Sequence, residues 1–216
     1  MIILTDNFNT EFGIIQTSIQ TGNTKSLIQN NGLTVNTLGH KITLEIINLQ
    51  NGLISKKMPI ETSIGWRWYI EKVNSKEEKI SIECKLLNPT INTEFGASSG
   101  EYLDAIEIEN KTHHLHIGTE DTDALWERAQ NDDWLPKRFE NKLGLHRNKV
   151  LDFTKYIDFG FKTNIPNLGK GEKIYFHYLV ATNKIKMNNY DKETQDISTW
   201  FAVEQSKREI DQYLGT

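Results

Sequence analysis

The segment 111–121, KTHHLHIGTED, holds the densest group of side chains that could do chemistry. Its HHLHIG run has the composition of a β-strand, in which successive side chains point to opposite faces. His114 and His116 would then share one face, with His113 on the other, and Glu120 would follow just past a Gly-containing bend. Two imidazoles and a carboxylate suit iron, manganese, zinc or nickel. The spacing predicts a divalent metal site at His114, His116 and Glu120; the alternative is a sheet surface whose histidines are solvated or hydrogen-bonded to neighbours.

The same three residues, in the order H-x-H-x3-E, resemble the first metal motif of the cupins, a family of all-β double-stranded barrels. The second cupin motif begins with a glycine, five further residues and a proline, and Gly160 and Pro166 have that spacing. His177 follows on a predicted strand, later than the last histidine of the family motif. Ile108 and Glu127 stand where the family has glycines around its first motif. The resemblance covers a minor part of the chain and implies a metal-dependent enzyme that uses the three side chains.

A second group of candidate residues surrounds a helix predicted at 122–131. Carboxylates lie on both sides of this helix, and a tryptophan and two basic residues follow in a predicted loop. Excursions of this kind from a rigid scaffold often carry binding residues, and carboxylates attract a basic partner that an aromatic side chain can anchor. The predicted binding residues are Asp121, Asp123, Asp132, Asp133, Trp134, Lys137 and Arg138.

The carboxylates of this segment have two other interpretations. Paired carboxylates can perform the acid/base chemistry of a glycosidase, and acidic residues at a helix start can simply favour the helix dipole. The helix could also plug one end of the fold, with Leu125, Trp126 and Trp134 all facing inward. Of the five tryptophans, Trp134 has the strongest signs of exposure because charged residues frame it, and we expect the other four mostly in the core.

Other catalytic motifs are absent from the sequence. It contains no G-x-S-x-G elbow, P-loop, G-x-G-x-x-G or C-x-x-C. The single cysteine, Cys84, alternates with Ile80 and Ile82 in a predicted strand, so we expect a buried and unreactive thiol. A lone cysteine cannot form an internal disulfide, which fits a reducing cytoplasm.

Charge and hydropathy limit the remaining function classes. The 216 residues carry a formal net charge of -4, spread along the chain, with no basic footprint for nucleic acid. The first residues have no positively charged signal region, and no apolar stretch is long enough to span a membrane. We therefore expect a soluble cytoplasmic protein that neither binds nucleic acid nor spans a membrane.

Alternation with a period of two residues dominates the chain, and clusters such as TGN, NNG and QNG separate the alternating runs. Helix is predicted at 122–131 and 206–214, and the run ISTWFAVE near the end reads as a strand. The predicted fold class is therefore all-β: an antiparallel β-sandwich or roll with two short helices, forming a single domain over 1–216. One continuous core is predicted to contain Trp66, Trp68, Ile80, Ile82, Phe176, Val180 and Phe201.

The pentapeptide NTEFG occurs twice, at 9–13 and at 92–96. A duplicated domain would keep its apolar positions in step at this offset, but Trp66 falls opposite Lys149. We interpret the repeat as an accident in a chain rich in Asn and Thr.

Three function classes remain open. The first, which we favour, is a non-enzymatic cytoplasmic binding protein, such as a bacterial toxin-neutralising immunity protein or another accessory factor. It would bind a basic protein partner rather than a small molecule. The second is a cupin-like enzyme, and the third is a carbohydrate- or lipid-binding module, which the aromatic content suggests. No organic cofactor is predicted, and a divalent metal is the one candidate cofactor.

Overall fold

The computed structural model describes residues 1–22, 29–49, 60–90, 93–98, 105–120, 122–142, 153–185, 199 and 202–203. Within these ranges the strands form two antiparallel sheets, accompanied by the α-helix α1 (Thr122–Asn131) and the 3-10 helix η2 (Lys137–Lys142). The all-β sandwich expected from the alternating sequence pattern is confirmed, and so is the helix at 122–131. No helix in the described ranges is long and apolar enough to cross a membrane.

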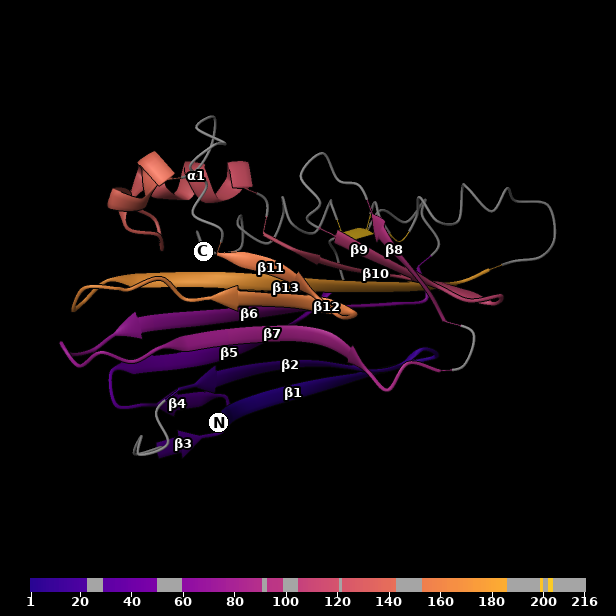
Figure 1. Cartoon of the computed structure of the whole chain (residues 1–216), viewed down its shortest axis with the longest axis horizontal. Coiled ribbons are helices and arrows are strands. Elements are labelled where there is room, and N and C mark those ends of the chain that lie inside the picture. The colour runs from indigo at the N-terminus through magenta and orange to yellow at the C-terminus, as the bar shows by residue number, and fades with distance from the viewer. Residues whose placement is uncertain are drawn as a thin grey trace.

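The first sheet has the strand order β1-β2-β7-β12-β11 among the described residues (Figure 1). The strands are β1 (Ile2–Thr10), β2 (Gly13–Thr21), β7 (Ile80–Leu87), β11 (Thr154–Ile157) and β12 (Gly160–Asn164). Strict alternation is visible in β7, where Ile80, Ile82, Cys84 and Leu86 are buried and the residues between them are partly exposed. One face of this sheet therefore covers the core.

The second sheet has the order β3-β4-β5-β6-β13-β10-β9-β8 among the described residues. Its strands are β3 (Gln29–Asn31), β4 (Thr34–Asn36), β5 (His40–Asn48), β6 (Thr62–Lys72), β8 (Glu94–Ser98), β9 (Ala105–Glu109), β10 (His113–Thr119) and β13 (Lys173–Lys184). The long strand β13 pairs with β6 on one side and with β10 on the other. β13 therefore positions the residues of both β6 and β10.

The main core lies between the two sheets, and its aromatic side chains come largely from β6 and β13. The indole N–H of Trp68 donates to Thr17 Oγ1 at 2.9 Å, and that of Trp66 donates to Asp6 Oδ2 at 2.7 Å, so each tryptophan also joins the sheets by a hydrogen bond. The described residues predicted for the core are confirmed as members of one cluster, namely Trp66, Trp68, Ile80, Ile82, Phe176 and Val180. Phe201 lies outside the described residues.

The opposite face of the eight-stranded sheet, called here the polar face, carries several buried polar side chains beside the apolar Leu179 and Ala181. Alternation in β6, β13 and β10 places on this face Arg67, Tyr175, His177, His114 and His116, all of which are buried. Figure 1 shows α1 on this side of the molecule, near β10 and β13 and away from β1 and β2. The polar groups therefore lie in a second interface, between the sheet and the segments that cover it.

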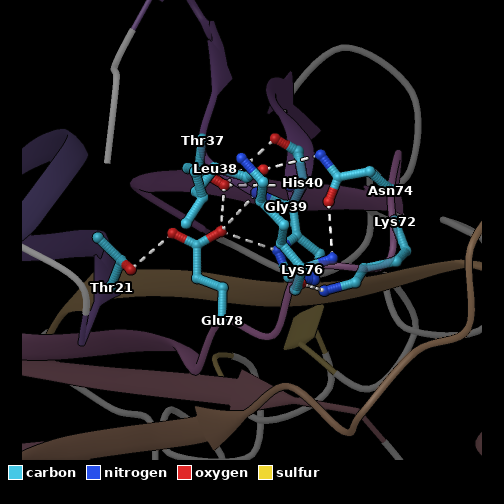
Figure 2. A network of polar contacts seen from close by, with 9 residues as sticks. All are labelled: Thr21, Thr37, Leu38, Gly39, His40, Lys72, Asn74, Lys76 and Glu78. Atoms are coloured by element: carbon cyan, nitrogen blue, oxygen red, sulfur yellow. Dashed lines mark hydrogen bonds and ion pairs between the residues drawn. The ribbon is translucent and has the colours of Figure 1, made fainter. Parts of the chain in front are cut away.

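A buried carboxylate joins three connections at one end of the sandwich (Figure 2). Glu78, in the β6–β7 connection, accepts hydrogen bonds from the hydroxyls of Thr21 and Thr37 and from the Gly39 amide. His40 Nδ1 lies 3.1 Å from the same carboxylate. The network thereby ties the end of β2 to the β4–β5 turn and to the loop before β7.

The expectation of a strand in ISTWFAVE is wrong at its described positions, because Thr199, Ala202 and Val203 are helical. Ala202 and Val203 pack in an apolar cluster with Leu179 of β13, and Thr199 Oγ1 lies 2.8 Å from His116 Nδ1. A short apolar run of this length fits a buried helical turn as well as a strand. The helix predicted at 206–214 lies outside the described residues.

The two NTEFG copies have different structures. The first forms the turn between β1 and β2, where Phe12 is fully buried and Gly13 has a φ of 129°. In the second, Glu94 and Phe95 begin β8, and Phe95 is 47% exposed. The interpretation of the repeat as an accident is consistent with this difference.

Candidate functional site

A surface pocket of about 640 Å³ lies between two loops, 132–138 and 170–173. The first loop connects α1 to η2, and the second leads into β13. Five of the seven predicted binding residues line this pocket, namely Asp132, Asp133, Trp134, Lys137 and Arg138. Asp123 is exposed on α1 and does not line it, and Asp121 lies outside the described residues.

The first loop begins with a tightly hydrogen-bonded helix end. The Asp133 amide donates to the Arg128 carbonyl at 3.0 Å, and the Asp132 amide donates to the Ala129 carbonyl at 3.3 Å. Asp132 has a φ of 53°, the left-handed conformation that this type of helix end requires and that aspartate tolerates better than most residues. Its side chain then accepts a hydrogen bond from the Lys137 amide at 3.0 Å. These contacts give the loop a defined shape.

Trp134 stands at the inner wall of the pocket and is half-buried. Its ring packs edge-on against Tyr69, with centroids 5.0 Å apart, and against Tyr175, with centroids 6.4 Å apart. Lys173 Nζ lies 5.4 Å from the centroid of the indole. Trp134 also has a φ of 49°, which is uncommon for a bulky residue. The tryptophan is therefore held in position by the polar face of the eight-stranded sheet.

An arginine–glutamate pair connects the two loops. Arg138 donates to both carboxylate oxygens of Glu172, at 2.9 and 2.6 Å, and to the Asn167 carbonyl at 2.7 Å. The Gly169 amide donates to Glu172 as well, at 2.6 Å. The hydrogen bonds from Arg138 hold the pKa of Glu172 below its usual value, and those to Glu172 raise the pKa of Arg138. This ion pair bridges the two loops that line the pocket.

Charges of both signs surround the pocket. Its lining contains the basic side chains of Lys137, Arg138, Lys170 and Lys173 and the acidic side chains of Asp132, Asp133 and Glu172. Arg138 and Glu172 pair with each other, and the other charged side chains of the lining are lysines and aspartates. The second loop was not among the predicted binding residues, because no local sequence pattern joins positions 34 residues apart. The pocket surface therefore combines acidic and basic side chains.

The predicted metal ligands His114, His116 and Glu120 each contact different partners. His116 Nδ1 lies 2.8 Å from Thr199 Oγ1. One Glu120 carboxylate oxygen lies 2.9 Å from Arg128 Nη2. Glu109 approaches His114, with 3.5 Å between the carboxylate and Nδ1. Among the described residues, the group of three potential ligands within 4.8 Å of one another is instead Glu107, Glu109 and His114.

Glu120 belongs to a buried ion cluster that attaches α1 to the sheet. Its other oxygen lies 3.2 Å from His177 Nδ1 and accepts from the His177 amide at 3.0 Å. The Arg128 guanidinium carbon lies 3.7 Å from the centroid of the Tyr175 ring, and Arg128 also donates to the Tyr175 carbonyl at 3.2 Å. His177, the downstream histidine of the cupin resemblance, therefore does meet Glu120 in space. The cluster joins the helix that carries the pocket loop to the centre of the sheet.

Comparison with known proteins assigns no family. No protein-family model matches the chain, and no curated protein sequence is significantly similar to it. The function is therefore inferred from the geometry of the pocket and of the polar sheet face.

Proposed function

We propose that this protein is a non-enzymatic interaction protein of the cytoplasm that binds a protein partner through the pocket formed by loops 132–138 and 170–173. The observation that carries the proposal is the placement of Trp134. The indole is half-buried, rests on two tyrosines and lies inside a rim of charged side chains. Energetically dominant interface residues typically are anchored aromatics of this kind, surrounded by polar contacts that exclude water.

The rigidity of the loops supports binding over a purely structural role for this surface. The helix-end hydrogen bonds, the Asp132 side chain and the Arg138–Glu172 pair fix both loops before any partner arrives. A preformed surface saves the entropy that ordering a flexible loop would cost on binding. We therefore expect a partner that fits the pocket without large rearrangement.

The charge pattern also constrains the partner. Asp132 and Asp133 favour basic groups opposite them, as the sequence suggested, whereas Lys170 and Lys173 favour acidic groups. The partner surface should therefore carry both basic and acidic groups, at positions that lie opposite the aspartates and the lysines of the pocket. Lys173 lies over the indole, which disfavours the stacking of a sugar ring on Trp134 and makes a carbohydrate-binding module the weaker alternative.

The test is affinity capture from a lysate of the native host, followed by identification and purification of the captured protein. The wild type is compared with the triple variant Asp132→Lys, Asp133→Lys, Trp134→Ala. A matched control, Glu77→Lys with Asp158→Lys, reverses two exposed charges that do not line the pocket. All three proteins must show the same folded circular dichroism spectrum. The partner should bind the wild type and the control but not the triple variant; equal capture by all three excludes this surface.

A further inference from the structure

A compact group of metal-binding side chains lies on β9 and β10, apart from the pocket. The strand register places His114 directly opposite Glu109 and His116 directly opposite Glu107. Ile106 and Ile108, which alternate with the glutamates, are fully buried in the core. The two glutamates and the histidines therefore share the polar face of the eight-stranded sheet.

The distances in this group are close to those of a coordination sphere. One ligand atom from each of Glu107, Glu109 and His114 falls within 4.8 Å of the other two. His114 Nδ1 and Glu109 Oε2 are 3.5 Å apart, longer than a usual N–H···O hydrogen bond. Two ligands bound about 2.1 Å from one tetrahedral ion would be separated by about 3.4 Å. A single ion between the two side chains thus requires little movement.

The charges and burial of the group also favour a cation. Glu107 and Glu109 project from the same face of one strand, where like charges repel each other. The Glu109 side chain is 21% exposed, so an ion can reach it from solvent, whereas His114 is buried and fixed. Gly96 lies opposite Glu107 on β8, and a methyl group there would lie 3.6 Å from the Glu107 carboxylate.

We propose that Glu107, Glu109 and His114 bind one divalent first-row transition-metal ion, with Zn²⁺ as the best-suited probe. One imidazole and two carboxylates prefer such ions to Mg²⁺ or Ca²⁺, which take oxygen ligands. The site shares His114 with the set expected from the H-x-H-x3-E spacing. Its two carboxylates come from the neighbouring strand, whereas Glu120 contacts Arg128 and His177.

This metal site is separate from the pocket of the proposed function. His114 pairs with Asn183 of β13, whereas Trp134 contacts Tyr175 of the same strand. Eight residues of strand separate these positions, a distance of roughly 26 Å. In Figure 1 β8 and β9 lie to the right and α1 to the left. Loss of the metal and loss of the partner can therefore be observed independently.

The experiment is isothermal titration calorimetry: the full chain, stripped of metal with a chelator, is titrated with Zn²⁺ and, for comparison, with Mg²⁺. One Zn²⁺ per chain should bind, and Glu107→Gln and Glu109→Gln should each weaken its Kd at least about tenfold, since even outer-shell partners have effects of that size. The matched control is Glu71→Gln, a partly exposed glutamate of β6 on the same sheet face. It should bind as the wild type does. Melting temperatures measured without metal verify that every variant is folded.

Two results overturn the proposal. The first is the absence of stoichiometric Zn²⁺ binding by the wild type. The second is Zn²⁺ binding that survives in Glu107→Gln and Glu109→Gln but is lost in His116→Gln, which would assign the ion to the H-x-H-x3-E set instead. Capture of the protein partner by Glu109→Gln should remain at the wild-type level, so that failure of the metal site and failure of the proposed binding surface give different results.

Discussion

At the scale of single residues, the chain buries several charged groups and compensates each with specific partners. The Glu78 side chain is fully buried and accepts hydrogen bonds from Thr21, Thr37 and the Gly39 amide. His40 lies beside it, and burial lowers the pKa of His40 below 6.5, an effect that outweighs the opposing hydrogen bond with Glu78. The imidazole is therefore neutral near pH 7 and can donate from Nδ1 to the carboxylate.

We predict that the lowered pKa of His40 makes stability fall with acidification. Well above pH 6.5 the imidazole is neutral in both the folded and the unfolded chain and contributes no pH dependence. As the pH falls from 6.5 towards the lower folded pKa, the unfolded chain binds a proton first, and the free energy of unfolding decreases. Urea midpoints measured about one pH unit above and below 6.5 should differ less in His40→Asn than in the wild type. Equal differences in the two proteins would show that His40 does not titrate in this way.

At the scale of elements, α1 is positioned by one buried ion pair and the pocket by one exposed pair of the same chemistry. Arg128 and Glu120 are both buried and meet at 2.9 Å. Arg138 and Glu172 meet at 2.6 Å, but their side chains are 48% and 28% exposed. Removing one partner of a buried pair leaves an uncompensated charge, whereas water readily solvates the survivor of an exposed pair. The two pairs should therefore differ greatly in their contribution to stability.

We predict that Arg128→Gln lowers the free energy of unfolding by about 3–5 kcal/mol, because it leaves the Glu120 carboxylate buried without its guanidinium. Arg138→Gln, the matched change in the exposed pair, should cost at most about 1 kcal/mol. Chemical denaturation of the two variants and the wild type measures both values. Comparable losses in the two variants would mean that Arg128 does not hold α1 on the sheet.

The sequence predicted the elements well wherever one periodicity dominated. β7 alternates strictly, and α1 begins and ends at the predicted residues. The prediction failed at Thr199, Ala202 and Val203. A short apolar run there is compatible with both a strand and a helix, and contacts with distant residues determine which one forms.

Contacts between distant segments explain what the sequence missed in the candidate sites. The first pocket loop was predicted from composition, but its partner loop joins it through Arg138 and Glu172, which lie far apart in the chain. The carboxylates near His114 were missed for the same reason. Their position depends on the β9–β10 register, which a local motif such as H-x-H does not reveal.

At the scale of the whole molecule, one long strand supports both surfaces. β13 lies between β6 and β10, and its buried core face includes Phe176 and Val180. Its opposite face carries Tyr175 beneath Trp134 and Asn183 beside His114. The rigidity of both surfaces thus depends on the packing of the two sheets, in which the β6 tryptophans take a large part.

We predict that Trp68→Ala lowers the free energy of unfolding by about 3–5 kcal/mol. The substitution removes a fully buried indole and its hydrogen bond to Thr17, which joins the two sheets. Trp68→Phe should lower the free energy of unfolding by less, since phenylalanine keeps most of the apolar volume of the indole. Guanidinium denaturation gives both values, and an unchanged midpoint in Trp68→Ala would contradict the placement of this face in the core.

The central claim is that Trp134 anchors a protein partner, and the most direct test is the Kd of the purified partner for Trp134→Ala. We predict an increase of at least about 30-fold, since truncation of an anchoring aromatic residue typically costs 2 kcal/mol or more. Trp126→Ala, which removes a partly buried tryptophan of α1 outside the pocket, should leave the Kd within a few-fold of wild type. A wild-type Kd for folded Trp134→Ala would contradict the claim.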